Sequence, residues 1–127
     1  MKKFNARDGK GIELLRNRGI LTGIVTSENT EIVTRRAEKL KVDFLFQGIT
    51  DKIIALDELV RVTGHSKKEV AYIGDDINDL EIMSQVGISF APSNAIKAVK
   101  SAATIICQSR GGDGCYREAV EMLLQAI

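Results

Sequence analysis

The stretch Val70-Ala71-Tyr72-Ile73-Gly74-Asp75-Asp76-Ile77-Asn78-Asp79 decides the fold. Its first four residues are typical of a buried strand, and a glycine and three aspartates follow in a polar turn. Leu80, Met83 and Val86 then recur at helical spacing. A buried strand that passes through a polar turn into a helix is the repeating unit of parallel α/β sheets. Ligands of such sheets bind beyond the carboxyl ends of the strands, so the same turn is a candidate functional site.

The rest of the chain repeats this alternation of strand and helix. We expect five strands, at 21–25, 44–46, 70–73, 88–91 and 104–107. We expect helices after Asn29, from Asp51, from about Leu80, over 95–101 and after Gly114, with Ser66 and Glu69 forming a capping box. This order predicts an α/β fold with a mostly parallel sheet and right-handed crossovers. The length of 127 residues suits a single domain over 1–127.

Composition limits the classes of function. Hydrophobic residues make up 44% and charged residues 28% of the chain, which argues against intrinsic disorder. The net charge of +1 predicts neither a nucleic-acid partner nor a membrane partner, and no apolar run is long enough to span a bilayer. We therefore expect a cytoplasmic protein whose two cysteines, Cys107 and Cys115, are reduced. A single histidine, His65, excludes a His-rich metal site.

Three carboxylates lie within five residues in the turn after strand 70–73. Asp75 ends the strand, and Asp76 and Asp79 follow it. Clustered carboxylate oxygens suit Mg²⁺, which keeps several waters and needs few protein ligands. The alternative is that Asp76 or Asn78 only caps a helix. A cap needs one such residue, so three beside a glycine favour the metal site.

Two other strand ends carry residues that suit a phosphate. Thr26 and Ser27 follow the first strand, where a hydroxyl and backbone N–H groups can bind phosphate oxygens or, equally well, cap a helix. Lys52 follows Asp51 at a helix start, where it can neutralise a phosphate as a point charge. A surface lysine is the simpler interpretation of Lys52 alone. Its position against the helix dipole is nevertheless mildly suggestive of function.

Taken in order, Thr26, Lys52 and Gly74-Asp75-Asp76-x-x-Asp79 resemble the haloacid dehalogenase superfamily. Further residues resemble its cap-less sugar-acid phosphatases, which act on 3-deoxy-D-manno-octulosonate 8-phosphate or 2-keto-3-deoxy-nononate 9-phosphate. The resemblance covers nearly the whole chain. The residues that carry it are Lys3-Phe4-Asn5, Asp8, Gly11-Ile12, Gly19-Ile20, Arg35-Arg36-Ala37, Gln47-Gly48, Asp51-Lys52, Gly111-Gly112-Asp113-Gly114 and Arg117-Glu118.

The resemblance implies a three-layer Rossmann-like fold and a Mg²⁺-dependent phosphatase that works through an aspartyl-phosphate. It implies that Asp75 binds Mg²⁺ and that Asp76 and Asp79 support the metal site. It also implies that Thr26 bonds the phosphoryl oxygens and that Lys52 pairs with the phosphate and the nucleophile. Charge stabilisation by a metal and a lysine agrees with the electrostatic nature of phosphoryl transfer.

The resemblance places substrate recognition around Ser27, Glu28, Arg36 and Lys39. Arg36 and Lys39 are three residues apart on an expected helix, where they could hold a sugar carboxylate or equally form a solvated face. The octulosonate branch usually carries Arg where this chain has Glu28, which favours the nononate branch weakly. Arg117 resembles a tail arginine that works near a neighbouring subunit's site, and the family forms homotetramers.

The chain departs from the family pattern at its start. The family begins with a central strand ending in Asp-x-Asp, which holds the nucleophile and the general acid/base, and no Asp-x-Asp occurs here. Asp8 is no substitute, because it lacks a preceding apolar strand. We expect that Met1 is an internal methionine or a late start, and that two half-sheets ending at Thr26 and Asp75 flank the missing strand. A non-catalytic binding or assembly module is the alternative function. A phosphoacceptor receiver domain is disfavoured, because the acidic turn lies in the wrong order for it.

Overall fold

The computed structural model describes residues 6–111 and 114–126 as alternating strands and helices. The strands are β1 (Gly23–Val25), β2 (Phe44–Phe46), β3 (Ala71–Ile73), β4 (Ile88–Ala91) and β5 (Ile105–Ile106). The α-helices are α1 (Ala6–Asn17), α2 (Glu31–Leu40), α3 (Lys52–Thr63), α4 (Leu80–Gln85), α5 (Lys97–Ala102) and α6 (Cys115–Ala126). Two short 3₁₀-helices, η1 (Lys67–Glu69) and η2 (Ile77–Asp79), precede β3 and α4. No helix in these two ranges is long and apolar enough to cross a bilayer.

The strands form two parallel sheets, which confirms the expected α/β class. β1 pairs with β2 in one sheet, and β3, β4 and β5 pair in that order in the other. The strand before Thr26 and the strand before Asp75 therefore lie in different sheets over the described ranges, as the sequence predicts.

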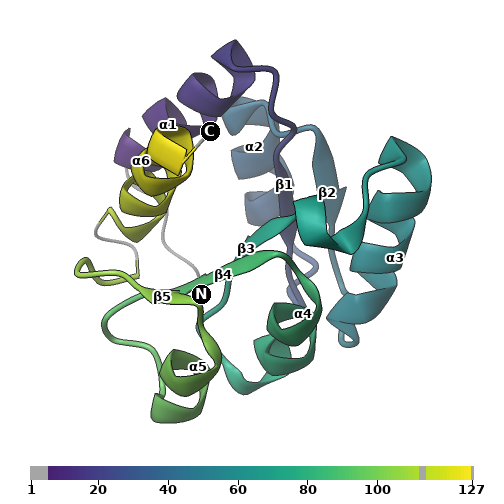
Figure 1. Cartoon of the computed structure of the whole chain (residues 1–127). Coiled ribbons are helices and arrows are strands. Elements are labelled where there is room, and N and C mark those ends of the chain that lie inside the picture. Colours follow the sequence, from purple (N-terminus) through teal and green to yellow (C-terminus); the bar gives the residue numbers. More distant parts are fainter. Residues whose placement is uncertain (1–5, 112–113, 127) are drawn as a thin grey trace.

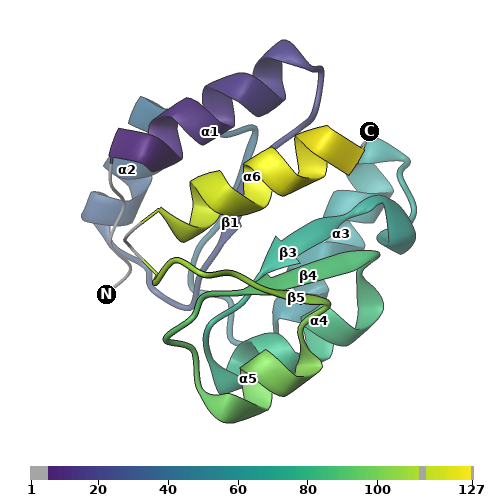
Figure 2. The same cartoon turned by 60° about the vertical axis from the view of Figure 1, so that its left-hand side comes forward.

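The larger sheet lies between two layers of helices. Figures 1 and 2 show α6, with α1 beside it, over one face and α4 and α5 over the other. On the α6 face, Phe90 of β4 packs with Cys107, Cys115 and Ala119 in a buried cluster. Two further clusters, centred on Leu56 with Ile82 and Val86 and on Met83 with Ala91 and Val99, fill the opposite side. The two cysteines are thiols, as expected.

Alternate residues of β3 and of β1 form backbone hydrogen bonds to the paired strand of the same sheet. In β3, the Gly74 N–H donates to Phe90 O and the Val70 carbonyl accepts from Gly87 N, so these alternate residues face β4. In β1, the Thr26 N–H donates to Phe46 O and the Thr22 carbonyl accepts from Phe44 N.

The remaining residues of the two edge strands must point the other way. Alternate residues of a parallel strand point their N–H and C=O groups to opposite sides. The edges of β1 and β3 that are unpaired among the described residues therefore carry the N–H and C=O groups of Gly23 and Val25 and of Ala71 and Ile73.

The expected helix signals are confirmed, with one helix missed. The Asp51 carboxylate accepts from Ile53 N at 3.2 Å as the N-cap of α3, and Ser66 and Glu69 form the capping box of η1. The sequence offers no comparable signal for α1. Its Gly11 comes close to α6, because a Cβ there would lie 3.2 Å from the ring of Tyr116.

Candidate active site

Thr26, Lys52 and the Asp75–Asp79 turn gather at the carboxyl ends of β1, β2 and β3. Thr26 follows β1 directly, and its carbonyl accepts from Ile49 N at 3.1 Å in the segment that leads to Lys52. Lys52 opens α3 and reaches the other sheet, where its Nζ lies 2.6 Å from Asp79 Oδ1. These contacts bring the carboxyl ends of the two sheets to one place.

Asp79 is the centre of this arrangement. Its side chain has no exposed surface, and its two oxygens accept four hydrogen bonds. Lys52 Nζ and Tyr72 Oη each donate to Oδ1 at 2.6 Å. The backbone N–H groups of Asp75 and Asp76 donate to Oδ2 at 3.0 and 3.1 Å. Asp79 thereby ties β3, α3 and the start of the acidic turn together.

Gly74 makes room for the buried carboxylate. A Cβ at this position would lie 2.5 Å from Met83 Sδ and 2.8 Å from Asp79 Cβ, closer than packed atoms allow. The glycine before the aspartates is therefore required by close packing of Asp79 beneath the strand end.

The ionisation of this centre follows from burial and its donors. Burial alone would raise the pKa of Asp79, but hydrogen bonds from Lys52, Tyr72 and the Asp75 N–H outweigh it and lower the pKa to about 2. Burial, together with the charge of Asp79, raises the pKa of Tyr72 far above its usual value. The carboxylate is thus ionised and the phenol is a permanent donor at neutral pH.

Lys52 is a buried residue, so the simple interpretation as a surface lysine is wrong. It is 5% exposed, and its side chain crosses to a carboxylate 27 residues further along the chain. A buried charge is costly unless it is paired, and Asp79 supplies the carboxylate partner of Lys52.

Asp75 and Asp76 differ from Asp79 in exposure. Both are exposed at the end of β3. Asp76 also caps η2, because its Oδ1 accepts from Ile77 N at 2.7 Å. The described residues contain no group of three or more acidic, histidine or cysteine side chains placed to hold a metal. Of the three predicted metal residues, Asp75 and Asp76 thus have exposed side chains, while both oxygens of Asp79 accept hydrogen bonds within the chain.

Thr26 is buried, and its hydroxyl belongs to the turn after β1. The Oγ1 atom accepts from Glu28 N at 3.1 Å, which leaves the hydroxyl proton to be donated elsewhere. Thr26 does not cap the next helix. Thr30 is the N-cap of α2, and its Oγ1 accepts from Val33 N.

The predicted substrate residues lie on three separate segments of the described chain, namely the turn after β1, helix α2 and helix α6. Ser27, Arg36 and Lys39 are exposed, the last two on α2, and Glu28 is half-buried. Arg117 lies on α6 and donates to Glu121 Oε1 at 3.0 Å. Gly112 and Asp113, and the residues before Ala6, lie outside the described ranges.

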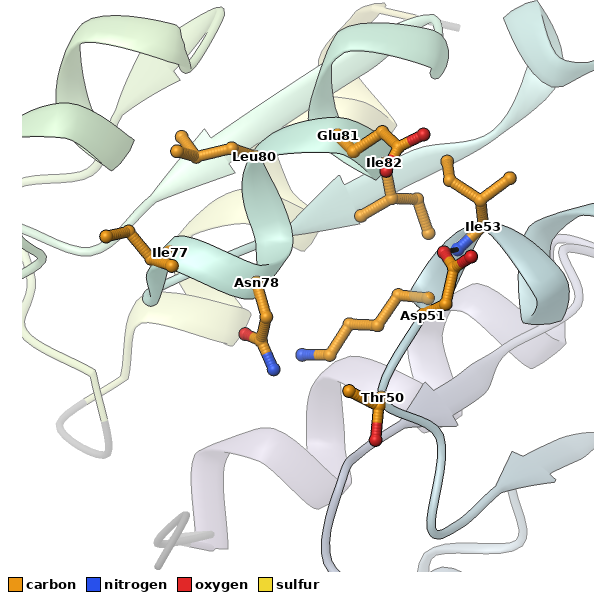
Figure 3. Close-up of a pocket in the computed structure, with 9 residues that line it drawn as sticks. Thr50, Asp51, Ile53, Ile77, Asn78, Leu80, Glu81 and Ile82 are labelled. Atoms are coloured by element: carbon orange, nitrogen blue, oxygen red, sulfur yellow. Dashed lines mark hydrogen bonds between the residues drawn. The ribbon is translucent and has the colours of Figure 1, made fainter.

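A hollow of about 400 Å³ opens beside Lys52. Figure 3 shows Thr50 and Asp51, at the start of α3, on one side of this space and Asn78, from η2, on the other. None of Ser27, Arg36, Lys39 or Arg117 lines it.

Sequence reasoning missed Tyr72. Its place within an apolar run indicated only a core strand residue. The phenol was itself a signal, because a buried tyrosine usually finds a partner for its hydroxyl.

A parallel α/β fold with a threonine, a lysine and an acidic turn at the carboxyl ends of its strands defines a class of phosphate-handling hydrolases. The haloacid dehalogenase-like hydrolase family matches residues 24–118. The chain belongs to this family.

Curated proteins with similar sequences belong to a narrower class within this family, the sugar-acid phosphatases. The chain is 36% identical to the 3-deoxy-D-manno-octulosonate 8-phosphate phosphatase of Yersinia pestis, over 99% of this chain and 67% of the relative. The corresponding phosphatase of Haemophilus influenzae is 35% identical, over 99% of this chain and 70% of the relative. The chain thus spans about two thirds of the length of these phosphatases.

Solved structures agree with the family assignment. A probable phosphatase from Pseudomonas syringae has a TM-score of 0.95 and 40% identity, over 99% of this chain and 72% of that one. The octulosonate 8-phosphate phosphatase of Moraxella catarrhalis, solved with magnesium, phosphate and the sugar acid, has a TM-score of 0.94 and 33% identity, over 99% and 72% of the two chains.

Proposed function

We propose that this chain is the phosphate- and metal-binding part of a Mg²⁺-dependent phosphatase that hydrolyses a phosphorylated 3-deoxy sugar acid. The observation that carries the proposal is the buried Lys52–Asp79 pair directly behind the Asp75–Asp76 turn. A desolvated lysine tied to a turn with two exposed carboxylates is suited to a phosphoryl group and its cation. Similarity to octulosonate 8-phosphate phosphatases supports the substrate class.

Asp75 and Asp76 would hold the magnesium ion. Mg²⁺ binds hard oxygen ligands, keeps several waters and needs only one or two carboxylates besides phosphate oxygens, so two exposed aspartates fit it. Asp79 would support the site from beneath by holding the Asp75 and Asp76 N–H groups. When bound, the cation would offset negative charge on the phosphoryl oxygens.

Lys52 and Thr26 would bind the phosphoryl group from the other side. Lys52 uses one N–H on Asp79 and has three, and the Thr26 hydroxyl keeps its proton for an acceptor. Both are buried, so their hydrogen bonds to an anion would be strong. In the proposed mechanism, the phosphoryl group passes through an aspartyl-phosphate on an Asp-x-Asp segment, which the printed sequence does not contain.

The proposal extends to the sugar acid and the assembly. Arg36 and Lys39 would hold the sugar carboxylate, with Ser27 and Glu28 beside the hydroxyl groups, and Arg117 would act near a neighbouring subunit in a homotetramer in the cytoplasm. Glu28 favours the nononate weakly, whereas the similarity to octulosonate 8-phosphate phosphatases favours the octulosonate. Titration calorimetry with both sugar acids would decide between them, because the true substrate acid should bind more tightly.

Titration calorimetry with Mg²⁺, followed by inorganic phosphate in saturating Mg²⁺, tests the central proposal. We expect the chain to bind both, and Asp75→Asn to weaken Mg²⁺ at least tenfold. Asp57→Asn removes an exposed carboxylate in the middle of α3 that pairs with Lys67, and it should leave both affinities unchanged. Absence of Mg²⁺-dependent phosphate binding would refute the proposal.

A non-catalytic binding or assembly module is the second candidate, because the buried Lys52–Asp79 pair behind the Asp75–Asp76 turn would suit phosphate binding without hydrolysis. Release of phosphate from octulosonate 8-phosphate and from nononate 9-phosphate separates the two. Binding without turnover by the native gene product supports the module, and turnover that Asp75→Asn abolishes supports the phosphatase.

A further inference from the structure

We propose that Tyr72 is a positioning residue of the phosphate site: its hydroxyl shares one oxygen of Asp79 with Lys52, and so keeps the Lys52 ammonium available to a phosphoryl group. This inference rests on the proposed function. It concerns how the lysine is held, not which substrate it meets.

The geometry converges on a single atom. Tyr72 Oη donates to Asp79 Oδ1 at 2.6 Å, and Lys52 Nζ donates to the same atom at 2.6 Å. The tyrosine comes from the middle of β3, and the lysine from the first turn of α3. Asp79 Oδ2 is meanwhile held by the N–H groups of Asp75 and Asp76. The carboxylate cannot rotate without breaking bonds to three separate parts of the chain.

Sharing the oxygen limits how strongly Asp79 holds the lysine. A carboxylate oxygen has two lone pairs, and here the phenol takes one and the ammonium the other. A hydrogen bond from a hydroxyl withdraws part of the negative charge that would otherwise be directed at Lys52. Among the described residues, Lys52 therefore makes one short side-chain bond, and two of its N–H donors stay available.

Removing the hydroxyl should redirect Lys52 towards its carboxylate. Without the Tyr72 hydroxyl, the second lone pair of Asp79 Oδ1 is free to accept another hydrogen bond from the Lys52 ammonium. Both side chains are buried, so this bond would be strong. A lysine that donates two hydrogen bonds to Asp79 is a weaker partner for phosphate. The Asp75–Asp76 turn keeps its bonds to Oδ2, so the proposed metal ligands should be unaffected.

The ring of Tyr72 has a separate, structural role. It packs against the cluster of Leu56, Ile82 and Val86 and against that of Met83, Ala91 and Val99. Tyr72→Phe keeps this packing and deletes only the hydroxyl, so it separates positioning from packing.

The test compares Tyr72→Phe with the wild-type chain by calorimetry. We expect the dissociation constant of inorganic phosphate in saturating Mg²⁺ to rise three- to tenfold, and that of Mg²⁺ alone to change less than twofold. Ser89→Ala is the matched control. It deletes a buried hydroxyl that bonds Thr104 on the same sheet, so it should lower the melting temperature without changing either affinity.

Several outcomes would overturn the proposal. Unchanged phosphate affinity in Tyr72→Phe would do so, as would an equal loss of phosphate and Mg²⁺ affinity, which indicates a structural role. If the wild-type chain binds no phosphate, the proposed function has failed. Crystal structures of both chains then decide the positioning role, which survives only if the Lys52 ammonium is displaced in Tyr72→Phe.

Discussion

The two sheets of this molecule differ in how they are stabilised. The β3–β4–β5 sheet has buried clusters on both faces, and Phe90 and Ala91 of β4 are almost inaccessible to solvent. In the β1–β2 sheet, Phe44, Leu45 and Phe46 are all half-buried, and none of the buried clusters in the described ranges includes them. In the candidate site, Thr26 follows a strand of the β1–β2 sheet, and the acidic turn follows a strand of the β3–β4–β5 sheet. Its contacts therefore join a well-packed half to a weakly packed one.

The largest expected effect comes from breaking the contact between the halves. Asp79→Ala leaves Lys52 buried without a counter-charge and strips the turn N–H groups of their acceptor, so we expect a loss of about 3–5 kcal/mol of unfolding free energy. Urea denaturation measures it. Asp57→Ala breaks an exposed pair and should change the unfolding free energy by less than about 1 kcal/mol. Equal losses of unfolding free energy in the two variants would show that the buried pair stabilises the protein no more than an exposed one.

Matched truncations on the two sheets test their unequal packing directly. Phe90→Ala empties a fully buried site and should cost about 3–5 kcal/mol of unfolding free energy. Phe46→Ala removes a half-buried ring whose centroid lies 6.4 Å from that of the stacked Phe44 ring. We expect it to lower the free energy of unfolding by about 1–2 kcal/mol. The same denaturation experiment compares them. A cost for Phe46→Ala as large as that for Phe90→Ala would contradict the comparison.

Acid should weaken the contact between the halves selectively. The pKa of Asp79 falls from 3.8 to about 2 on folding, so its contribution is fully present above pH 3.8 and is lost as the pH falls towards 2. At about 1.4 kcal/mol per pKa unit, the loss is on the order of 2 kcal/mol. Unfolding free energies of wild type and Asp79→Asn, measured between pH 6 and pH 2, should converge as the pH falls. Parallel curves would exclude this linkage.

The smallest effect should come from a helix cap in the weakly packed half. Thr30→Ala removes the hydroxyl that accepts from Val33 N and should cost about 1 kcal/mol of unfolding free energy. Thr30→Ser keeps the acceptor and should recover most of it. Amide exchange in α2 reports whether the loss stays local, and faster exchange across β3–β5 would show that it does not.

Sequence patterns predicted the strands better than the long contacts. Strands 44–46 and 88–91 are confirmed to the residue, because short apolar runs between polar turns have few other structures available. Helix α1 was missed because Gly9 and Gly11 lower its helix propensity. Packing against α6 stabilises it instead, with Gly11 beside Tyr116 and Val120, and Ile12 and Leu15 of the helix are buried.

Sequence patterns indicated the residues that the structure gathers at the candidate site, but not how these residues contact one another. The spacing of Lys52 and Asp79 along the chain gives no sign that the two side chains meet, because that contact depends on how α3 packs beside η2. The same holds for Tyr72, whose partner lies in the following turn. Sequence alone identifies residue types that suit a phosphate and a metal, whereas tertiary packing determines which of them are buried, paired or exposed.

The cluster beneath α6 has a practical consequence for thiol chemistry. Cys107 and Cys115 are 1% and 3% exposed, and burial raises the pKa of the Cys107 thiol, so neither should react with an alkylating reagent in the native protein. Alkylation then requires α6 to lift from β4 and β5. The rate of modification by iodoacetamide would therefore measure the opening of the well-packed half alone. No cysteine has to be introduced for this measurement.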